Sequence, residues 1–199
     1  HEQLALDSDR GKSCGQAAPG VAVRIVAADG RVLPVGEIGE VSVHGPNVMV
    51  GYWNKPEQTA EVLSDDGWYR TGDVGRLDDE GYLMLVDRAK DMIVTGGENV
   101  YCTEVEDALY THPAVSEATV FGIPHEQWGE AVHGVVVLRP GTDTSEIELI
   151  AHCHERIAGY KAPKTITLQT DPLPKSGPGK VLKRLLREPF WEGRERAIN

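Results

Sequence analysis

Hydrophobic and polar positions alternate along the first part of the chain. Residues 21–26, VAVRIV, alternate toward the turn pair Asp29-Gly30, and RVLPV follows, so this stretch predicts a β-hairpin. GEVSVHG at residues 39–45 and GYLMLV at residues 81–86 predict two further strands. Because short strands that end at Gly and Pro typically form small barrels or sandwiches, we predict a β-rich region that forms a small distorted barrel.

After Val86 the pattern becomes a mixture of helix and strand. Thr103 and Glu106 have the spacing of a helix capping box, which predicts a helix that ends near His112-Pro113. The spacing of hydrophobic residues after this helix predicts further elements. These are strands at residues 114–123, 131–138 and 164–170, and a second helix at residues 146–157.

The two patterns divide the chain at Asp87-Arg88. We expect a β-rich unit over residues 1–86 and a compact α+β unit over residues 87–199. The predicted fold class of the whole chain is therefore α+β. A chain of 199 residues has room for one large domain or two small ones.

Composition and charge narrow the class of protein. The formal net charge of −11 argues against nucleic-acid binding, although residues 175–196 carry seven Lys or Arg against three Glu. The sequence has no hydrophobic run of transmembrane length and no signal-peptide pattern, so we expect a soluble, cytoplasmic protein. Cys14, Cys102 and Cys153 lie far apart, and we expect free thiols.

The glycine-rich segment LPKSGPGKVLKR carries Lys180 behind Gly177 and Gly179. It does not match the P-loop pattern, because Pro174 replaces the first glycine and Val181 replaces the Ser or Thr hydroxyl. The glycines leave the backbone mobile, so the ammonium can be delivered to an anion elsewhere. On these residues alone, a solvated surface lysine is the commoner interpretation.

Two other segments contain candidate binding residues. GWYRTGD places Asp73 next to a predicted strand, where a carboxylate can bind the vicinal hydroxyls of a ribose. A simple polar turn is an equal alternative for this segment. Gly96-Gly97 either lets the backbone approach a ligand closely or forms a tight hairpin turn.

Other polar and aromatic groups indicate structure more than chemistry. The run of residues 152–155, HCHE, resembles a metal-binding cluster in composition. Consecutive helical residues point about 100° apart and do not converge on one ion, so we expect no metal site and a core-facing His154. The scattered tryptophans are interpreted as packing residues, namely Trp53, Trp68, Trp128 and Trp191.

Three motifs, taken in order, resemble the adenylate-forming (ANL) superfamily, which includes acyl-CoA synthetases, peptide-synthetase adenylation domains and luciferases. They are YRTGD at residues 69–73, DRAKDMIVTGGENVY at residues 87–101 and PKSGPGK at residues 174–180. VMVGYWNKPEQT, HPAV and YKAPK also match, so the resemblance covers nearly the whole chain. The second motif resembles the form found in acyl-CoA ligases, and the C-terminal residues 181–199 are similar to those of fatty-acyl-CoA ligases. Cys102 departs from the proline that many relatives have.

The resemblance implies a two-step reaction that uses ATP, Mg²⁺ and CoA. Members of the family join a carboxylic acid to ATP as an acyl-adenylate and then pass the acyl group to a thiol. Asp73 matches the residue that binds the ribose hydroxyls, and Arg88 matches a second ribose or phosphate contact. Asp87 matches the hinge about which a C-terminal lid rotates between the steps.

The resemblance also implies roles in the lid. Gly96, Gly97 and Glu98 match the loop that lines the thiol tunnel in the second step. Lys180 matches the catalytic lysine of the first step. A cation between the attacking carboxylate and the α-phosphate would stabilise the charge of the transition state. Lys180 would then swing away for the second step.

The family's phosphate loop and acyl pocket would lie upstream of His1. The sequence is therefore expected to be the C-terminal portion of an ATP-dependent acyl-CoA ligase that lacks the N-terminal adenylation core, with no adenylation activity of its own. The alternative is a non-catalytic lid-type module that binds a protein partner or a modifying enzyme acting on Lys180.

Overall fold

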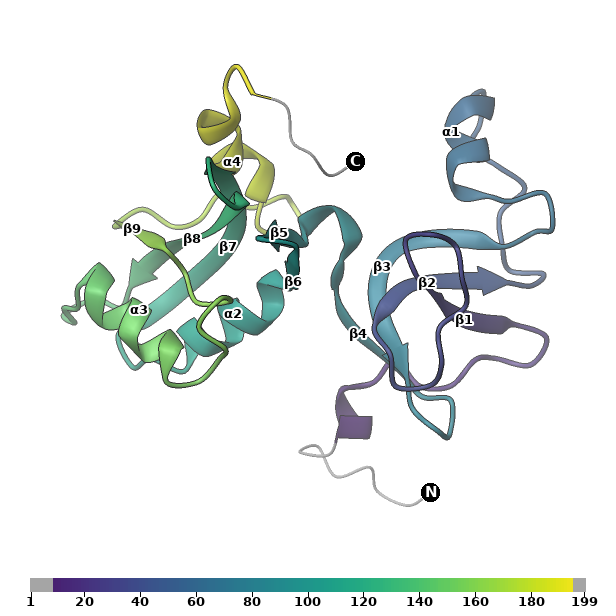
Figure 1. Ribbon diagram of the computed structural model, residues 1–199, viewed down its shortest axis with the longest axis horizontal. Coiled ribbons are helices and arrows are strands. Elements are labelled where there is room, and N and C mark those ends of the chain that lie inside the picture. Colours follow the sequence, from purple (N-terminus) through teal and green to yellow (C-terminus); the bar gives the residue numbers. More distant parts are fainter. Residues whose placement is uncertain (1–8, 195–199) are drawn as a thin grey trace. The chain divides into compact units, whose positions relative to one another are not determined.

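The chain divides into two compact units, His1–Ala89 and Lys90–Asn199, and the computed structural model describes residues 9–194 (Figure 1). The predicted α+β class is confirmed, with a β-rich first unit and a mixed second unit. The first unit contains η1 (Asp9–Lys12), β1 (Ala22–Val26), β2 (Gly39–His44), α1 (Pro56–Val62), β3 (Tyr69–Leu77) and β4 (Leu83–Arg88). After η2 (Ala89–Asp91) the chain continues with β5 (Ile93–Thr95), β6 (Glu98–Val100), α2 (Cys102–Tyr110), β7 (Val115–His125), β8 (Gly129–Leu138), α3 (Glu146–His154), β9 (Thr165–Gln169) and α4 (Lys183–Trp191).

The strands of the first unit form an antiparallel sheet in the order β1-β2-β3-β4. Within the described residues, β1 and β4 are the outer strands of this four-stranded order. The predicted hairpin at Asp29-Gly30 forms with a short second arm. The Ala27 amide donates to the Arg31 carbonyl oxygen at 2.9 Å, and the Leu33 amide donates to that of Ile25 at 2.8 Å. The longer ladder of β1 is with β2.

β3 is a strand that the sequence pattern did not predict, and a polar turn was one of the two interpretations left open for the segment around Asp73. Gly72 has a φ of +73°, and the β3–β4 register shifts between Val74 and Gly75. A Cβ atom on Gly75 would lie only 2.7 Å from the carbonyl oxygen of Met84. The glycines that resembled turn signals therefore serve a bulged strand.

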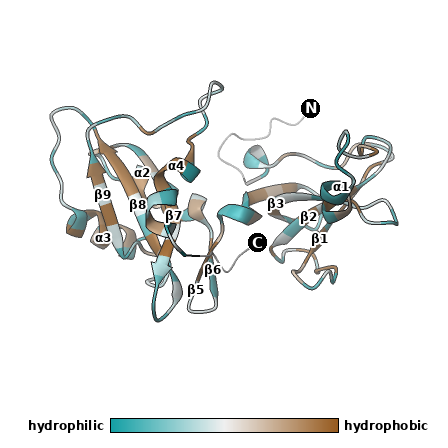
Figure 2. Cartoon of the chain, turned by 90° about the horizontal axis from the view of Figure 1, so that it is seen from above, coloured by the Kyte–Doolittle hydropathy of each residue, from teal (hydrophilic) through white to brown (hydrophobic). Residues whose placement is uncertain are grey.

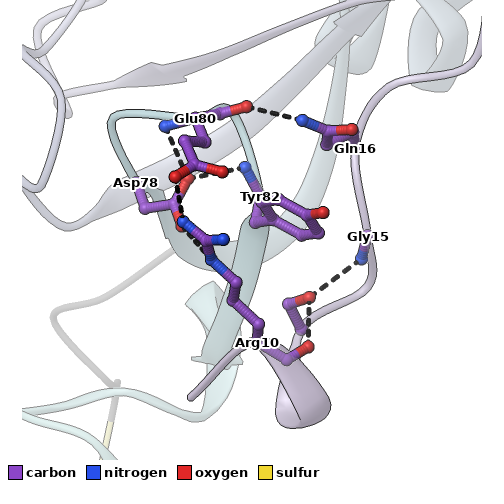
Figure 3. Close-up of polar contacts among 7 residues, drawn as sticks. Arg10, Gly15, Gln16, Asp78, Glu80 and Tyr82 are labelled. Carbon is purple, nitrogen blue, oxygen red and sulfur yellow. Dashed lines mark hydrogen bonds and ion pairs between the residues drawn. The ribbon is translucent and has the colours of Figure 1, made fainter. Parts of the chain in front are cut away.

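The segment before β1 is held against the turn between β3 and β4 (Figure 3). Arg10 forms ion pairs with Glu80 and, at 3.7 Å, with Asp78, and its guanidinium lies 5.0 Å from the ring centroid of Tyr82. The Gln16 side chain donates to the Glu80 carbonyl oxygen at 2.7 Å. These contacts fix the end of the hairpin that leads into β4.

In the second unit β8 lies at the centre of the sheet, antiparallel to β7 and β5 and parallel to β9. Figure 2 shows hydrophobic residues along β8, whose neighbouring side chains point to opposite faces. Helices α2 and α3 cover one face through Leu109 and Leu149, while α4 covers the other through Leu186 (Figure 1). The three predicted strands of this unit are confirmed, and α2 ends at Tyr110, two residues before the predicted end near His112-Pro113.

The predicted capping box of α2 is wrong. The helix begins at Cys102, its N-cap residue Tyr101 makes no side-chain cap bond, and the Glu106 carboxylate bonds the Val120 amide on β7 at 2.8 Å. A capping box instead starts α3, between Ser145 and its third helical residue. Tertiary contact of Glu106 with the neighbouring strand therefore replaces the local bond that the spacing indicated.

Two side chains, His154 and Trp53, differ from the packing that we expected. Helix α3 ends at His154, which is exposed, while Cys153 faces the core because it lies four residues after Leu149. Trp53 is 89% exposed within the first unit and is not a packing residue there. None of the three cysteines forms a disulfide, and burial raises the pKa of the Cys153 thiol to about 11.

None of the helices among residues 9–194 is long and apolar enough to cross a membrane.

Candidate functional site

Asp73 and Arg88 lie opposite each other on β3 and β4. The Nε of Arg88 is 3.3 Å from Oδ1 of Asp73, and the side chains are 42% and 36% exposed. A carboxylate has two oxygens that accept hydrogen bonds, so Asp73 can face both its cation and solvent. This arrangement presents an acceptor and a positive charge side by side on one surface of the sheet.

The backbone around Asp73 is held by side chains of its own unit. The Asp73 amide donates to Thr71 Oγ1 at 3.1 Å, and that hydroxyl donates to the Val41 carbonyl oxygen at 2.9 Å. The Gly72 amide donates to Glu40 Oε1 at 3.2 Å. The bulged strand is therefore fixed to β2 directly before the candidate carboxylate.

Tyr69, at the start of the same strand, extends this polar surface. Its pKa is raised above the ordinary value of 10.0, chiefly because its phenol is hydrogen-bonded to Tyr52, and further by partial burial. The Asp73 carboxylate acts in the same direction. Tyr69 was not among the predicted site residues, although its place at the head of the YRTGD motif was the available signal.

Asp87, the predicted hinge, is paired with Val74 across the ladder and is half-buried. Its Oδ1 accepts a hydrogen bond from the amide of Arg88 at 2.7 Å. Asp87 and Arg88 are the last residues of β4, and the division between the units falls shortly after them, between Ala89 and Lys90.

Gly96 and Gly97 form the two-residue turn of the β5–β6 hairpin, with φ values of +60° and +88°. Both lie in the left-handed region that favours glycine, so the hairpin interpretation of this pair holds. The turn also meets another element, because the Gly96 amide donates to the Trp128 carbonyl oxygen at 3.0 Å. Glu98 is exposed at the start of β6.

A pocket of about 290 Å³ lies beside this turn. Its lining residues are Thr95, Gly96, Glu98, Trp128, Tyr160 and Lys164. The Lys164 ammonium lies 5.0 Å from the Trp128 ring centroid, and the ring stacks on His125 at 4.3 Å. The pocket thus combines an aromatic face with a cation. Sequence reasoning missed Trp128 because nothing local separates it from the other tryptophans.

Lys180 lies on a hairpin that is closed by backbone hydrogen bonds. The Ser176 amide donates to the Lys180 carbonyl oxygen at 2.8 Å, and the Leu182 amide donates to that of Pro174 at 2.8 Å. Gly179 has a φ of +86° and allows the chain to turn. Lys180 itself is exposed, and no carboxylate of residues 9–194 is within ion-pair distance of its ammonium.

The structure brings the candidate residues together in two groups. Asp73, Asp87 and Arg88 belong to the first unit, and the Gly96–Glu98 turn and Lys180 belong to the second. Among residues 9–194, no three His, Cys, Asp or Glu side chains are arranged to hold a metal ion. The HCHE run separates: the His152 ring is bonded to the Thr111 hydroxyl at 2.8 Å, while Cys153 is buried.

Two segments of this chain, one in each unit, match known protein families. Residues 104–180 match the family described as AMP-binding enzyme C-terminal domain, and residues 3–53 match AMP-binding enzyme. A feruloyl-CoA synthase of Amycolatopsis sp is 49% identical over 84% of this chain and 34% of its own length. The medium/long-chain-fatty-acid–CoA ligase FadD8 of Mycobacterium tuberculosis is 43% identical over 96% of this chain and 34% of its own.

A solved structure agrees with these relatives. ATP-bound MatB from Rhodopseudomonas palustris is 39% identical, with a TM-score of 0.85 over 92% of this chain and 37% of that protein. The chain thus spans about a third of the length of the curated relatives that it matches. It belongs to the adenylate-forming superfamily of AMP-binding enzymes and corresponds to a C-terminal portion of such an enzyme.

Proposed function

We propose that the chain is part of an AMP-forming acyl-CoA ligase. The complete enzyme joins a carboxylic acid to AMP and then transfers the acyl group to the thiol of CoA. The observation that carries this proposal is the exposed ammonium of Lys180 at the end of a closed hairpin, without an acidic partner among residues 9–194. A long cation held away from local carboxylates suits the recognition of an anionic reacting group.

Asp73 and Arg88 are proposed to hold the nucleotide. The Asp73 carboxylate accepts hydrogen bonds from the two ribose hydroxyls, and Arg88, 3.3 Å away, orients it and contacts the ribose or a phosphate. Partial exposure of both side chains supports this role, because a ligand can reach them. Fixation of the bulged strand to β2 keeps the carboxylate oriented before the nucleotide arrives.

Lys180 is proposed to act in the first step. An oxygen of the substrate carboxylate attacks the α-phosphorus of ATP, the bond to the bridging oxygen breaks, and pyrophosphate leaves with the bonding electrons. The two reactants repel each other, and the ammonium offsets this repulsion as charge redistributes in the transition state. At 4 Å and an effective dielectric constant of 20, one such contact corresponds to about 4 kcal/mol before desolvation.

The second step is proposed to use the Gly96–Glu98 turn of the second unit in place of Lys180. Rotation about Asp87 withdraws Lys180 and brings the Gly96–Glu98 turn to the thiol channel. The pocket beside the turn supports this assignment, because the Trp128 ring and the Lys164 ammonium suit the aromatic base and the phosphates of CoA. Mg²⁺ would accompany ATP, but the described residues supply no ligand cluster for it, and we assign it no step.

The acid is proposed to be a fatty acid, and the 199 residues alone are proposed to be inactive in adenylation. FadD8 supports the first statement, because it matches nearly the whole chain. The feruloyl-CoA synthase is more identical over a shorter stretch, so an aromatic acid is the competing substrate.

The test is a panel of carboxylic acids with the complete enzyme, read by pyrophosphate release with and without CoA. The proposal expects release that depends on a fatty acid, and acyl-CoA as the final product. Preference for a hydroxycinnamic acid would change the substrate and keep the reaction. No release with any acid would leave a non-catalytic module, and exchange by the isolated 199 residues would contradict their proposed inactivity.

A further inference from the structure

The hairpin that carries Lys180 is held at both ends by carboxylates that the proposed reaction does not use. Glu117, on β7, contacts the segment that enters the hairpin, and Glu106, on α2, contacts the first residue of α4 directly after it. Neither carboxylate lies in the three family motifs. We infer that Glu106 and Glu117 are positioning residues that set where Lys180 is presented.

Glu117 fixes the entering arm through both of its carboxylate oxygens. Oε2 accepts a hydrogen bond from the Leu173 amide at 3.1 Å, and Oε1 receives the Lys175 ammonium at 2.8 Å. The pKa of Glu117 is lowered, first by the hydrogen bond from Lys175 and then by that from the Leu173 amide, so the carboxylate stays charged. The two bonds define both the position and the direction of the arm that leads to Lys180.

Glu106 fixes the leaving arm from a more enclosed position. Its Oε1 accepts from the Val120 amide at 2.8 Å and from the Thr119 hydroxyl at 3.2 Å, and it receives the Lys183 ammonium at 2.8 Å. The side chains of Lys183 and Glu106 are only 18% and 17% exposed. Lys183 follows Lys180 by three residues, so this ion pair ties the hairpin to α2 and β7 together.

Hydrophobic contacts also hold the two arms of the hairpin against the sheet. Leu173 is 3% exposed and packs with Phe121 and Val137, and Val181 on the leaving arm packs against the same cluster. The hairpin is therefore seated on the face of the sheet opposite to α2 and α3. No atom of a more distant residue lies within 4 Å of a Cβ added at Gly177 or Gly179, so the restraint on the tip comes from its two arms.

This inference rests on the proposed role of Lys180 in adenylation. A displacement of about 1 Å in a catalytic group can reduce a rate about 100-fold, so the arms of the hairpin matter although they touch no substrate. The effect should be confined to the step in which Lys180 acts. Nucleotide affinity, which is assigned to Asp73 and Arg88, should not change.

The experiment uses the complete enzyme and measures the two half-reactions separately. For Glu117→Ala and Glu106→Gln we expect a kcat for adenylation lowered about 10-fold, an unchanged KM for ATP, and unchanged thioester formation from supplied acyl-adenylate. Glu117→Gln keeps an oxygen for the Leu173 amide and should lose less. Glu188→Ala is the matched control, because within residues 9–194 the carboxylate of Glu188 pairs only with Arg184, on the exposed side of α4.

The same Glu substitutions in the Lys180→Ala variant separate an effect on the position of Lys180 from a general loss of stability. In Lys180→Ala enzyme, Glu117→Ala and Glu106→Gln should cause no further loss of adenylation, because the group that they position is absent. An additive loss there, or an equal loss in both half-reactions, would overturn the inference. If Glu117→Ala and Glu106→Gln retain full adenylation while Lys180→Ala loses it, the positioning inference fails and the role of Lys180 stands. If Lys180→Ala itself adenylates normally, the proposed function fails first and the inference falls with it.

Discussion

The Nε of Arg88 lies 3.3 Å from Oδ1 of Asp73, and the two residues are direct partners across the β3–β4 ladder. The pair is therefore a product of strand register, which the bulge between Val74 and Gly75 adjusts. Thr71 fixes the backbone on one side of the pair, and Asp87 accepts a bond from the Arg88 amide on the other. Motif residues separated in the sequence thus form one small surface.

Arg88→Ala should weaken ATP binding by the complete enzyme. A hydrogen bond to a charged group contributes about 1.5–3 kcal/mol, which corresponds to a loss of about 10- to 100-fold in affinity. Isothermal titration calorimetry measures this directly. Arg31→Ala, which breaks the exposed pair with Asp29 in a turn of the same unit, should bind ATP as the wild type does. Equal affinities of all three proteins would rule out the nucleotide role of Arg88.

Substitution of the two glycines in the Lys180 hairpin, Gly177 and Gly179, should have different effects on adenylation. Neither has a neighbouring atom within 4 Å of an added Cβ, but only Gly179 has a left-handed φ, of +86°. Gly179→Ala should therefore strain the turn by about 1–2 kcal/mol and slow adenylation, while Gly177→Ala should be tolerated. Single-turnover adenylation rates provide the comparison. Identical rates for the two variants would show that the backbone conformation at Gly179 does not govern the presentation of Lys180.

Stability of the second unit should depend on His133. Its ring is bonded to the hydroxyls of Thr165 at 2.7 Å and Thr167 at 3.3 Å, and it packs against Phe190. Burial lowers its pKa below the ordinary 6.5, with Glu146 acting weakly in the opposite direction. The unfolded chain therefore binds the proton more tightly. The stabilisation is complete above pH 6.5 and is lost as the pH falls through the lower folded value.

Urea unfolding at about pH 7.5 and about pH 5.5 tests this dependence. The wild type should lose stability at the lower pH, and His133→Gln should lose less because it has no titrating ring. His154→Gln is the control, since that side chain is exposed on α3, and it should behave as the wild type. A His133→Gln protein with the full wild-type pH dependence would show that another group is responsible.

Sequence reasoning succeeded where a strong pattern coincided with one element. The long apolar runs of β7 and β8 and the strand β9 follow from hydrophobic periodicity. The roles of Asp73, Arg88 and Lys180 come from motif order and stay predictions. These features are encoded by neighbouring residues, so no knowledge of distant contacts was needed.

Failures arose where distant contacts decide the local structure. Glu106 has capping-box spacing, but its carboxylate bonds the Val120 amide and the Lys183 ammonium, which lie far from it in the sequence. The glycines of β3 resemble a turn signal in the sequence. In the structure they lie in a bulged strand, because β4 supplies the pairing ladder. Trp128 is marked only by the Gly96 turn and Lys164, which the fold brings beside it. Local patterns contain none of these partners.

The central claim, that Lys180 serves the first half-reaction of an adenylating enzyme, is tested most directly by Lys180→Ala in the complete protein. Carboxylate-dependent ATP–pyrophosphate exchange and the conversion of supplied acyl-adenylate to thioester are measured on the same preparation. The account predicts that exchange falls about 100- to 1,000-fold while thioester formation stays near the wild-type rate. Equal loss in both reactions, or unchanged exchange, would contradict it.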